Sequence, residues 1–415
     1  MNAPLVRATP DPRSPLLGIR VVELGWAAAG PLVGTYLASH GADVIHLESS
    51  TALDPFRSTY PPFKDNVPGP DRAAMFSFYN AGKRGVTLDL KQPRAVELAL
   101  RLVATADVVI ESFPAGTLAR RGLGVAALRA AKSDLVIFSS CNQGQTGPHA
   151  QHPGYGSQLT ALAGFTELLG DPERTPVILY GPYIDYIAVG YGVIAILAAL
   201  DRRARTGQGC VIDLSQYEAG LQFMAPALLE HAANGTLPTR AGNRDRVAVP
   251  HGVYPTSEPD SWIALSVWDD GEWSHLVEAL GDPEWARDSA LATADGRRTR
   301  EAWVDERIAE WSRRQPRARA VARLRAKGLR ASEVRSIGEL FAEAQLVERR
   351  AWRTATHPVM GEVRLMAPPF VLSDAEQGPD RPGPLLGRHT EEVFRGIVGL
   401  DAAEYAACEA AGVFK

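Results

Sequence analysis

The first 215 residues alternate between short apolar runs rich in β-branched residues and segments of helical pattern. This alternation restricts the possible fold more than any other feature of the chain. Strands are expected at residues 18–24, 42–48, 84–90, 107–113, 134–141 and 209–215, and helices at 31–40, 93–104 and 116–131. Strand–helix–strand units with short links form parallel sheets with helices on their faces. We therefore predict an α/β fold built on a doubly wound parallel sheet.

The sequence pattern changes after a further expected helix at residues 216–233. Residues 234–252 are polar and loop-like, which is typical of a crossing between domains. Residues 252–268 are expected to form two strands around a turn, and residues 270–281 and 298–314 two amphipathic helices. This order indicates a second, smaller α+β domain. A strand and a helix are expected again within residues 361–400.

The composition excludes some classes of function. A chain of 415 residues with 22% charged residues and a net charge of −4 has no basic excess, so nucleic acid is not an expected partner. Cys141, Cys210 and Cys408 are few and widely spaced, which predicts neither a disulfide framework nor a zinc site. Their scarcity fits a reducing compartment, and the polar, Pro-rich start does not resemble a secretory signal. We therefore expect a cytoplasmic protein.

Residues 178–200 form an apolar run that contains one charge, Asp185. The run is long enough to span a membrane, but it also holds a proline, three glycines and four tyrosines. We therefore expect a buried helix entered through a loop, and no membrane. A buried carboxylate is costly unless it has partners or a task. From this segment alone, Asp185 could be a helix cap, an exposed loop residue or a functional group.

Other motifs give weaker signals. The first strand–helix turn, ELGWAAAGPLVG, lacks the G-x-G-x-x-G spacing, although Glu48 stands where a dinucleotide enzyme keeps its ribose-binding acid. Small residues for helix packing explain the turn better. His149 and His152 have no third ligand in a recognisable spacing, so no metal is expected. The chain also contains no G-x-S-x-G nucleophile elbow.

Several stretches, taken together and in this order, resemble the family III CoA-transferases, which include formyl-CoA transferase and the carnitine CoA-transferases. The stretches are LLGIRVVELGWAAAGPLVGTYLASHGADVIHLE, FYNAGKRGVTLDLK, ADVVIESFPAGTLARRGLG, PGYGSQLTALAG, ILAALDRRARTGQGCVIDLS, HGVYPTSEPDSWIALSV and PLLGRHTEEV. They cover the chain from Leu17 to about Leu400.

The resemblance implies a large Rossmann-like CoA-binding domain, a smaller α+β domain and an interlocked, ring-like dimer. The large domain is expected to contain residues 1–220 and 345–415, the small domain residues 245–330, and two linkers residues 221–244 and 331–344. The expected assembly is a homodimer, with a heteromeric pair as the alternative because some members work as two different subunits.

The resemblance also implies the reaction and its nucleophile. The family's catalytic aspartate lies before a long helix, upstream of an ILAAL…R…TG.G stretch, and Asp185 matches that position. The expected enzyme moves CoA from a donor acyl-CoA, with succinyl-CoA as one candidate, to a carboxylic acid. The expected intermediates are an aspartyl mixed anhydride and an aspartyl-CoA thioester. CoA and acyl-CoA are substrates in this scheme, and no cofactor is permanently bound.

Positions that match the family's CoA contacts form an expected cradle. They are Ala28, Ala29, Leu88, Lys91, Ser112, Phe113, Arg120 and Tyr155. The chain departs from the family pattern at three places. Ser49 replaces a basic residue found in some members, Ala28 replaces the glutamine of formyl-CoA transferase, and RAGNRDRVAVPHG replaces a glycine-rich lid. The acceptor is not readable, although Trp26, Tyr183, Tyr186 and Trp268 suggest a bulky or aromatic acid.

Two other activities stay open at this point. The α-methylacyl-CoA racemases share the fold and pair the matching aspartate with a histidine, but Tyr155 stands at that histidine's position here. A tyrosine is a poor base at neutral pH, which favours the transferase. The second alternative is a nucleotide-dependent oxidoreductase, which the strand–helix pattern and Glu48 suggest and the missing glycine fingerprint disfavours.

Overall fold

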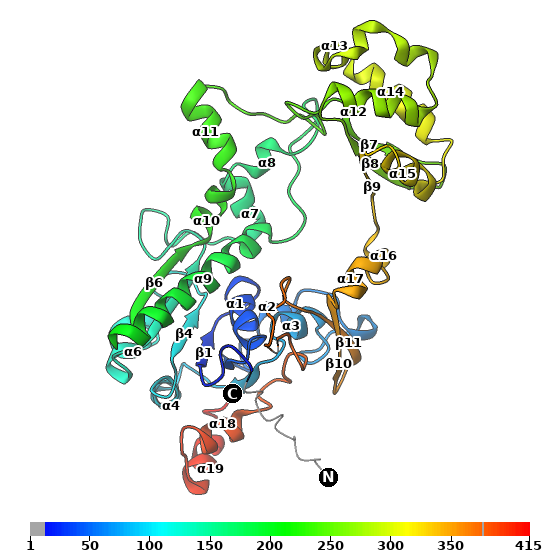
Figure 1. Cartoon of the computed structure of the whole chain (residues 1–415). Coiled ribbons are helices and arrows are strands. Elements are labelled where there is room, and N and C mark those ends of the chain that lie inside the picture. Colours follow the sequence, from blue (N-terminus) through cyan, green and yellow to red (C-terminus); the bar gives the residue numbers. More distant parts are fainter. Residues whose placement is uncertain (1–12, 376) are drawn as a thin grey trace. The chain divides into compact units, whose positions relative to one another are not determined.

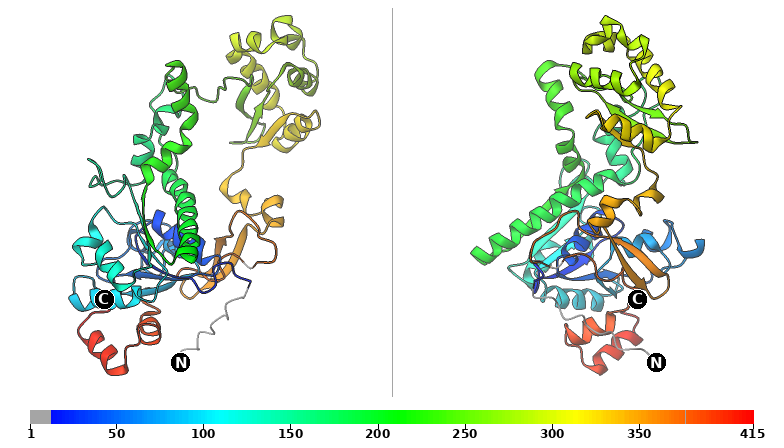
Figure 2. Two further views of the ribbon diagram at one scale, coloured as in Figure 1. Left: turned by 60° about the vertical axis from the view of Figure 1, so that its left-hand side comes forward. Right: turned by 45° about the vertical axis from the view of Figure 1, so that its right-hand side comes forward.

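A computed structural model describes residues 13–375 and 377–415. Its centre is a six-stranded parallel sheet in the order β3-β2-β1-β4-β5-β6 (Figures 1 and 2). The strands are β1 (Arg20–Leu24), β2 (Asp43–Glu48), β3 (Arg84–Thr87), β4 (Val108–Glu111), β5 (Val136–Cys141) and β6 (Cys210–Ser215). All neighbouring pairs in this sheet are parallel. The order reverses direction between β1 and β4, as in doubly wound folds. The predicted α/β class with a parallel sheet is therefore confirmed.

Helices cover both faces of the sheet (Figures 1 and 2). One face packs against α1 (Ala29–Ala38) and α9 (Tyr183–Thr206), and the other against α4 (Pro93–Val103) and α6 (Val125–Ala131). The same part of the chain also contains α2 (Pro55–Ser58), the 3-10 turn η1 (Lys64–Asn66), α3 (Ala74–Tyr79), α5 (Thr117–Arg120), α7 (Gly156–Leu162), α8 (Phe165–Leu168), α10 (Gln216–Phe223) and α11 (Ala225–Asn234).

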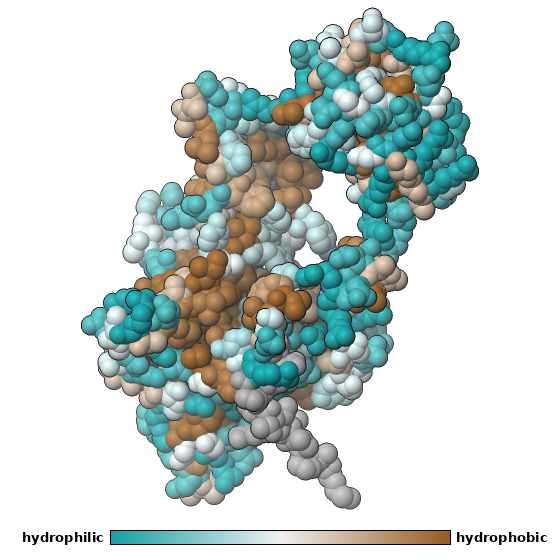
Figure 3. Space-filling view, viewed as in Figure 1, coloured by the Kyte–Doolittle hydropathy of each residue, from teal (hydrophilic) through white to brown (hydrophobic). Residues whose placement is uncertain are grey.

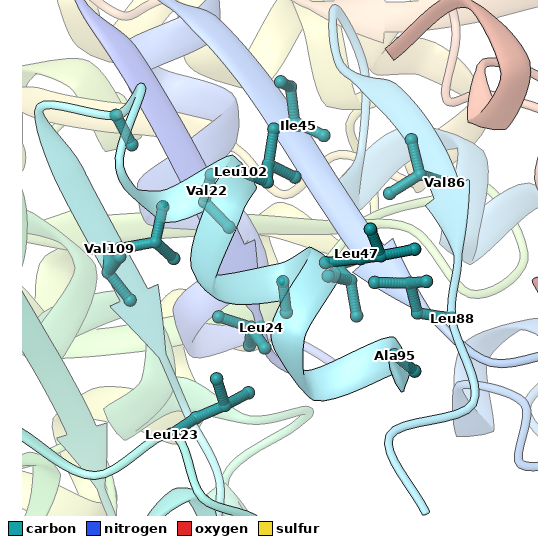
Figure 4. Packing of buried hydrophobic residues seen from close by; sticks show 14 of the residues in the cluster. Val22, Leu24, Ile45, Leu47, Val86, Leu88, Ala95, Leu102, Val109 and Leu123 are labelled. Carbon is teal, nitrogen blue, oxygen red and sulfur yellow. The ribbon is translucent and has the colours of Figure 1, made fainter. Parts of the chain in front are cut away.

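The four strands β1, β2, β4 and β5 divide their side chains between two cores. In β1, Val22 and Leu24 join the core beneath α4, whereas Val21 joins the core beneath α1 and α9. Figure 4 shows the first core, where residues from β1, β2, β3 and β4 meet side chains of α4. A strand buried on both faces reads as a continuous apolar run. This explains why these four strands were readable from the sequence.

Three helix predictions need correction. The helix expected at 116–131 is two helices, because Gly122 adopts a positive φ of 80° between α5 and α6. The helix expected at 216–233 divides into α10 and α11 at Met224, where the first turn of α11 contains a proline. Asp185 lies in the first turn of α9 rather than in a loop before the helix.

The chain divides into two compact units, and each is described by itself. Among the described residues, the first contains 13–165, 178–235, 344–375 and 377–415, and the second contains 166–177 and 236–343. The second unit holds an antiparallel sheet of β7 (His251–Pro255), β8 (Trp262–Ser266) and β9 (Arg330–Glu333). Its helices are α12 (Asp270–Leu280), η2 (Glu284–Arg287), η3 (Ser289–Ala292), α13 (Ala294–Thr299), α14 (Glu301–Ser312), α15 (Arg317–Arg325) and α16 (Ile337–Leu340). It is an α+β unit with a core of its own.

Residues 344–375 and 377–415 return to the first unit. They form α17 (Ala344–Glu348), the antiparallel hairpin β10 (Trp352–His357) and β11 (Gly361–Met366), α18 (Thr390–Gly396) and α19 (Ala402–Ala410). This segment is tied to the edge strand β3, where Gly85 N donates to His389 Nδ1 at 3.1 Å and Thr87 N donates to Thr390 Oγ1 at 3.1 Å. The C-terminal segment and the parallel sheet therefore build one unit.

A fully buried ion pair lies between β1 and the start of β3. Lys83 Nζ donates to both carboxylate oxygens of Glu23, at 2.8 and 2.9 Å, and to the Pro31 carbonyl oxygen of α1 at 2.7 Å. His46 Nδ1 lies 2.7 Å from Glu23 Oε1. Burial alone would raise the pKa of Glu23, but the Lys83 ammonium and the His46 ring hold this pKa below its ordinary value. The network joins β1, β2, α1 and the start of β3 at one point.

Gly34 of α1 makes room for this network, because a Cβ there would lie 1.8 Å from Glu23 Oε2. We expect Gly34→Ala to lower the free energy of unfolding by at least about 3 kcal/mol, since it displaces a paired buried charge. Gly396→Ala in α18 is a matched control, because its Cβ would meet no atom within 4 Å and should change stability by less than about 1 kcal/mol. Urea denaturation of both variants tests this, and equal stabilities would contradict the account.

Candidate functional site

A cavity of about 590 Å³ lies at the carboxyl ends of the parallel strands of the first unit. Residues from the end of each strand, or directly after it, line this cavity. They are Leu24 and Trp26 after β1, Glu48 and Ser49 after β2, Leu88 and Lys91 after β3, Ser112 and Phe113 after β4, Cys141 and Asn142 after β5, and Gln216 after β6. Ligands of open α/β sheets bind at this edge, where the strand order reverses.

Asp185 projects into this cavity from the first turn of α9. Its carboxylate has no hydrogen-bond or ion-pair partner within residues 13–375 and 377–415. The side chain does not cap the helix, because the N-cap residue is Pro182 and no side chain makes a cap hydrogen bond. The helix-cap interpretation of Asp185 is therefore wrong. Asp185 is therefore a carboxylate without partners on the wall of a cavity.

The surroundings of Asp185 disfavour its charge. Burial raises the pKa of this carboxyl to about 7, and no neighbouring cation offsets the effect. Gly156 lies against it, where a Cβ would come within 2.9 Å of Asp185 Oδ1. The next residue, Tyr186, donates or accepts a short hydrogen bond with the hydroxyl of Tyr79, whose pKa burial raises. Asp185 is half-buried, and its small and aromatic neighbours keep water from much of the carboxylate.

Two glycines allow α9 to pack closely against its neighbours. A Cβ on Gly192 would lie 2.8 Å from the ring of Phe138 in β5, so the helix can approach the sheet only because this residue is glycine. A Cβ on Gly220 of α10 would lie 2.7 Å from Ile184, the fully buried neighbour of Asp185. Among the described residues, α9 is also the helix whose length and apolar composition would suit a membrane span. Here one of its faces packs against α1, β5 and β6.

The first strand–helix turn has a strained backbone that a buried acid supports. Ala27 adopts a positive φ of 60°, which is unusual for a residue with a Cβ. Its N–H donates to Asp54 Oδ2 at 3.0 Å, while Phe56 N donates to Asp54 Oδ1 at 2.7 Å. This contact holds Ala28 and Ala29, at the start of α1, against the cavity. Sequence analysis missed Asp54, although Asp-Pro before a short helix is a capping signal.

The glycines of this turn have packing roles. A Cβ on Gly25 would lie 2.4 Å from Ser112 Oγ, and a Cβ on Gly30 would lie 2.7 Å from Ser112 Cβ. The end of β4 therefore approaches the turn closely. The Ser112 hydroxyl is buried and has no hydrogen-bond partner within the described part of the chain. The interpretation of the turn as a packing element agrees with these contacts.

The structure brings together most of the expected cradle. Ala28, Ala29, Leu88, Lys91, Ser112, Phe113 and Tyr155 all line the cavity with Asp185. Arg120 does not line it. Its guanidinium donates to Ala115 O at 3.4 Å and to Thr117 Oγ1 at 3.0 Å, and the adjacent Arg121 lies on the cavity wall instead. Trp26 and Phe113 meet edge to face, with ring centroids 5.5 Å apart.

Two weaker motifs have structural explanations. Glu48 accepts hydrogen bonds from Arg57 at both carboxylate oxygens, each at 2.8 Å, and is buried. This pairing argues against a ribose-binding role for Glu48. His149 and His152 pack together with ring centroids 4.5 Å apart, and no metal-ligand cluster occurs among residues 13–375 and 377–415. Asn142, which sequence analysis also missed, lines the cavity and holds the nearby loop by donating to Gly154 O at 2.9 Å.

Comparison with known proteins gives consistent results. The model of CoA-transferase family III matches residues 16–390. A succinate–glutarate CoA-transferase of Agrobacterium fabrum is 34% identical and covers 93% of this chain and 96% of its own. A succinyl-CoA–D-citramalate CoA-transferase of Chloroflexus aurantiacus is 31% identical, with coverage of 96% and 98%. A crystal structure of a CAIB/BAIF family protein from Brucella suis has a TM-score of 0.85 at 32% identity and covers 93% of this chain and all of its own.

The pKa of Asp185 predicts how stability depends on pH. The folded-state pKa of about 7 exceeds the ordinary value near 4, so the folded protein holds a proton that the unfolded chain releases. Stability therefore falls as pH rises from about 4 to about 7. We expect Asp185→Asn to be more stable than the wild type by about 2 kcal/mol or more at pH 8, and nearly equal at pH 4. Urea denaturation at both pH values tests this, and a wild type as stable as the variant at pH 8 would contradict it.

Proposed function

The chain belongs to CoA-transferase family III, and from this premise we propose that it transfers CoA from succinyl-CoA to an aliphatic dicarboxylic acid, with Asp185 as the nucleophile. Both relatives described above have succinate or succinyl-CoA in their names together with a second dicarboxylic acid. These names favour a small dicarboxylate over the bulky or aromatic acceptor suggested by the sequence. They also favour the transferase over the racemase and the oxidoreductase.

The observation that carries the proposal is the unpartnered carboxylate of Asp185 in the cavity at the sheet edge. A structural carboxylate in such surroundings would be expected to have a cation or N–H donors. A nucleophile needs the opposite, because partners that stabilise its charge also reduce its reactivity. Its raised pKa keeps the group poised between protonated and ionised forms near neutral pH.

In the proposed reaction, the Asp185 carboxylate is bonded covalently first to an acyl group and then to CoA. Ionised Asp185 attacks the thioester carbonyl of succinyl-CoA, and the C–S bond breaks to give a mixed anhydride and CoA thiolate. The thiolate then attacks the Asp185 carbonyl, which releases succinate and leaves an aspartyl-CoA thioester. The acceptor carboxylate attacks this thioester and again expels the thiolate. Attack of the thiolate on the acceptor's carbonyl forms the new acyl-CoA and restores Asp185.

Other wall residues support these steps. The first backbone N–H groups of α1 have no partner within the helix, and the first turn of α1 reaches the cavity at Ala28 and Ala29. These N–H groups can donate hydrogen bonds to the oxyanion that forms during each attack. The apolar wall around Trp26 and Phe113 limits the access of water, which would hydrolyse the anhydrides. Binding of the long CoA substrate along the sheet edge holds the thioester against the nucleophile.

We also propose that the active protein is a dimer. The exposed face of α9 carries an apolar stripe at Tyr186, Tyr191, Ile194 and Leu197, and Ile194 is 66% exposed. Figure 3 shows hydrophobic residues gathered over the region where α9 lies in Figure 1. Continuous apolar surface of this kind marks an interaction site. We further propose that the two subunits interlock as rings and that the domain bounds are those expected from the sequence. The proposed location is the cytoplasm.

Removing the nucleophile should abolish transfer. We expect Asp185→Asn and Asp185→Ala to lose at least about a thousandfold in kcat with succinyl-CoA and glutarate or D-citramalate, since a covalent nucleophile has no substitute. Asp201→Asn, an exposed aspartate in the same helix, is the matched control and should keep its rate. Chromatographic detection of the new acyl-CoA measures both. More than a tenth of wild-type activity in Asp185→Ala would reject the assignment.

The apolar stripe of α9 predicts the oligomeric state. Sedimentation at micromolar concentration should show a dimer, and Ile194→Glu should weaken it because a charge then lies within the buried interface. Val125→Glu on α6 places the same charge at an exposed apolar residue of the other helical layer, and should leave the dimer intact. A fully active monomer would contradict the proposal. A dimer that forms only with a second, different subunit would replace the homodimer with a heteromeric pair.

A further inference from the structure

Two segments of the cavity wall are connections between regular elements, and side-chain contacts hold them in place. One is the turn 112–116, which follows β4, and the other is the loop 142–155, which joins β5 to α7. Both segments contribute residues to the wall. The loop leads directly to Gly156, where a Cβ would come within 2.9 Å of Asp185 Oδ1. The contacts that fix these two segments therefore fix the wall on that side of the nucleophile.

The side chain of Gln145, in the loop 142–155, joins the loop to the turn 112–116. Its Oε1 accepts a hydrogen bond from Gly116 N at 3.2 Å, and its Nε2 donates to Glu111 Oε1 at 2.7 Å. The other carboxylate oxygen of Glu111 accepts from Phe113 N at 3.1 Å. A carboxamide suits this place because it donates from one atom and accepts at the other. One side chain of the loop thus holds the turn both directly and through Glu111.

Gln145 also lies between two acids. Its backbone N–H donates to both carboxylate oxygens of Asp213, at 3.0 and 3.1 Å. Glu111 and Asp213 stand on either side of Ser139, because the three residues are in register on β4, β6 and β5. Burial and then the charge of Asp213 raise the pKa of Glu111. The nearby thiol of Cys141 stays neutral, since burial and both acids raise its pKa to about 12. Within the described ranges neither acid has an ion-pair partner, so N–H donors stabilise their charges.

The other side-chain contacts of the loop have fewer partners. Gln151 Nε2 donates to Ala115 O at 3.0 Å, which is a second link to the turn 112–116. Asn142 Nδ2 donates to Gly154 O at 2.9 Å and closes the loop upon itself. Each of these amides joins two segments, whereas Gln145 joins the loop to β4, to β6 and to the turn. Gln145 is therefore the contact that fixes the loop at the most points.

We propose that Gln145 is a positioning residue for CoA transfer, because its hydrogen bonds hold the loop 142–155 and the turn 112–116 where they form the cavity wall beside Asp185. Gln145 does not line the cavity, so it acts through the residues that do. This inference rests on the proposed function. A thioester reacts quickly only when it is held in line with the carboxylate, and a small displacement of the wall is costly to the rate. Loss of the bridge leaves Asp185 in place and slows the reaction of substrate with it.

Gln145→Glu tests this, since it keeps the shape of the side chain and removes its donor. At pH 8 the new carboxylate faces Glu111 and repels it, whereas at pH 5.5 the two acids share a proton and one of them donates again. We expect kcat/KM with succinyl-CoA and glutarate to fall at least about tenfold at pH 8, as for the loss of a hydrogen bond to a charged group. At pH 5.5 the variant should come within about threefold of the wild type. Asp185 titrates in both proteins, so the ratio of their rates isolates the effect at Gln145.

The matched control is Gln143→Glu, which makes the same change two residues away in the same loop. The side chain of Gln143 makes no hydrogen bond within residues 13–375 and 377–415, and it does not line the cavity. Its variant should stay within about threefold of the wild type at both pH values, because no donor is lost. Gln145→Ala, which adds no charge, should lose about tenfold at both pH values. Urea denaturation at each pH shows that the compared proteins are folded during the assay.

The outcomes separate this inference from the proposed function. A wild-type rate in Gln145→Ala, or in Gln145→Glu at pH 8, would overturn the inference and leave the proposed function intact. A loss in the folded Gln145→Glu protein that is equal at pH 8 and pH 5.5 would overturn it as well, because a general loss of structure has no reason to recover with protonation of this pair. A wild-type protein that transfers no CoA would instead overturn the proposed function and the inference with it.

Discussion

The desolvated carboxylate of Asp185 is the constraint on which the site depends. Its ionised form has no partner in the described part of the chain, so packing elsewhere must offset the cost of holding it there. Gly192 and Gly220 permit that packing, because they bring α9 against β5 and α10 against Ile184. Gly156 completes the arrangement by leaving room for the carboxylate itself. The close approach of helix and sheet therefore both stabilises the first unit and positions its reactive group.

The parallel sheet explains why residues far apart in the sequence meet at one cavity. All six strands end at the same edge, and the chain leaves each strand there before it enters a helix or loop. Buried pairs keep this edge in shape: Arg57 holds Glu48 after β2, and Asp54 holds the strained Ala27 after β1. These groups do not need to touch a substrate. They maintain the backbone from which the cavity wall is built.

Much of the fold of the first unit could be predicted from the sequence, for physical reasons. Strands buried on both faces have continuous apolar runs, and Asp185 is conspicuous because it interrupts one. The helix breaks at Gly122 and Met224 were missed because a single turn residue does not disturb the apolar period. Asp54 was missed for another reason. Its contact with Ala27 joins segments that are separated in the sequence by α1 and β2, and no local pattern encodes it.

The central claim is that the Asp185 carboxylate becomes covalently linked to CoA during turnover. Peptide mass spectrometry after incubation with succinyl-CoA and no acceptor measures this most directly. The account predicts that the peptide containing Asp185 gains the mass of CoA through a thioester, and that hydroxylamine converts this adduct to a hydroxamate. An adduct on another carboxylate of the cavity, such as Asp89, would contradict the account. Turnover with no protein-bound CoA at any time would contradict it equally.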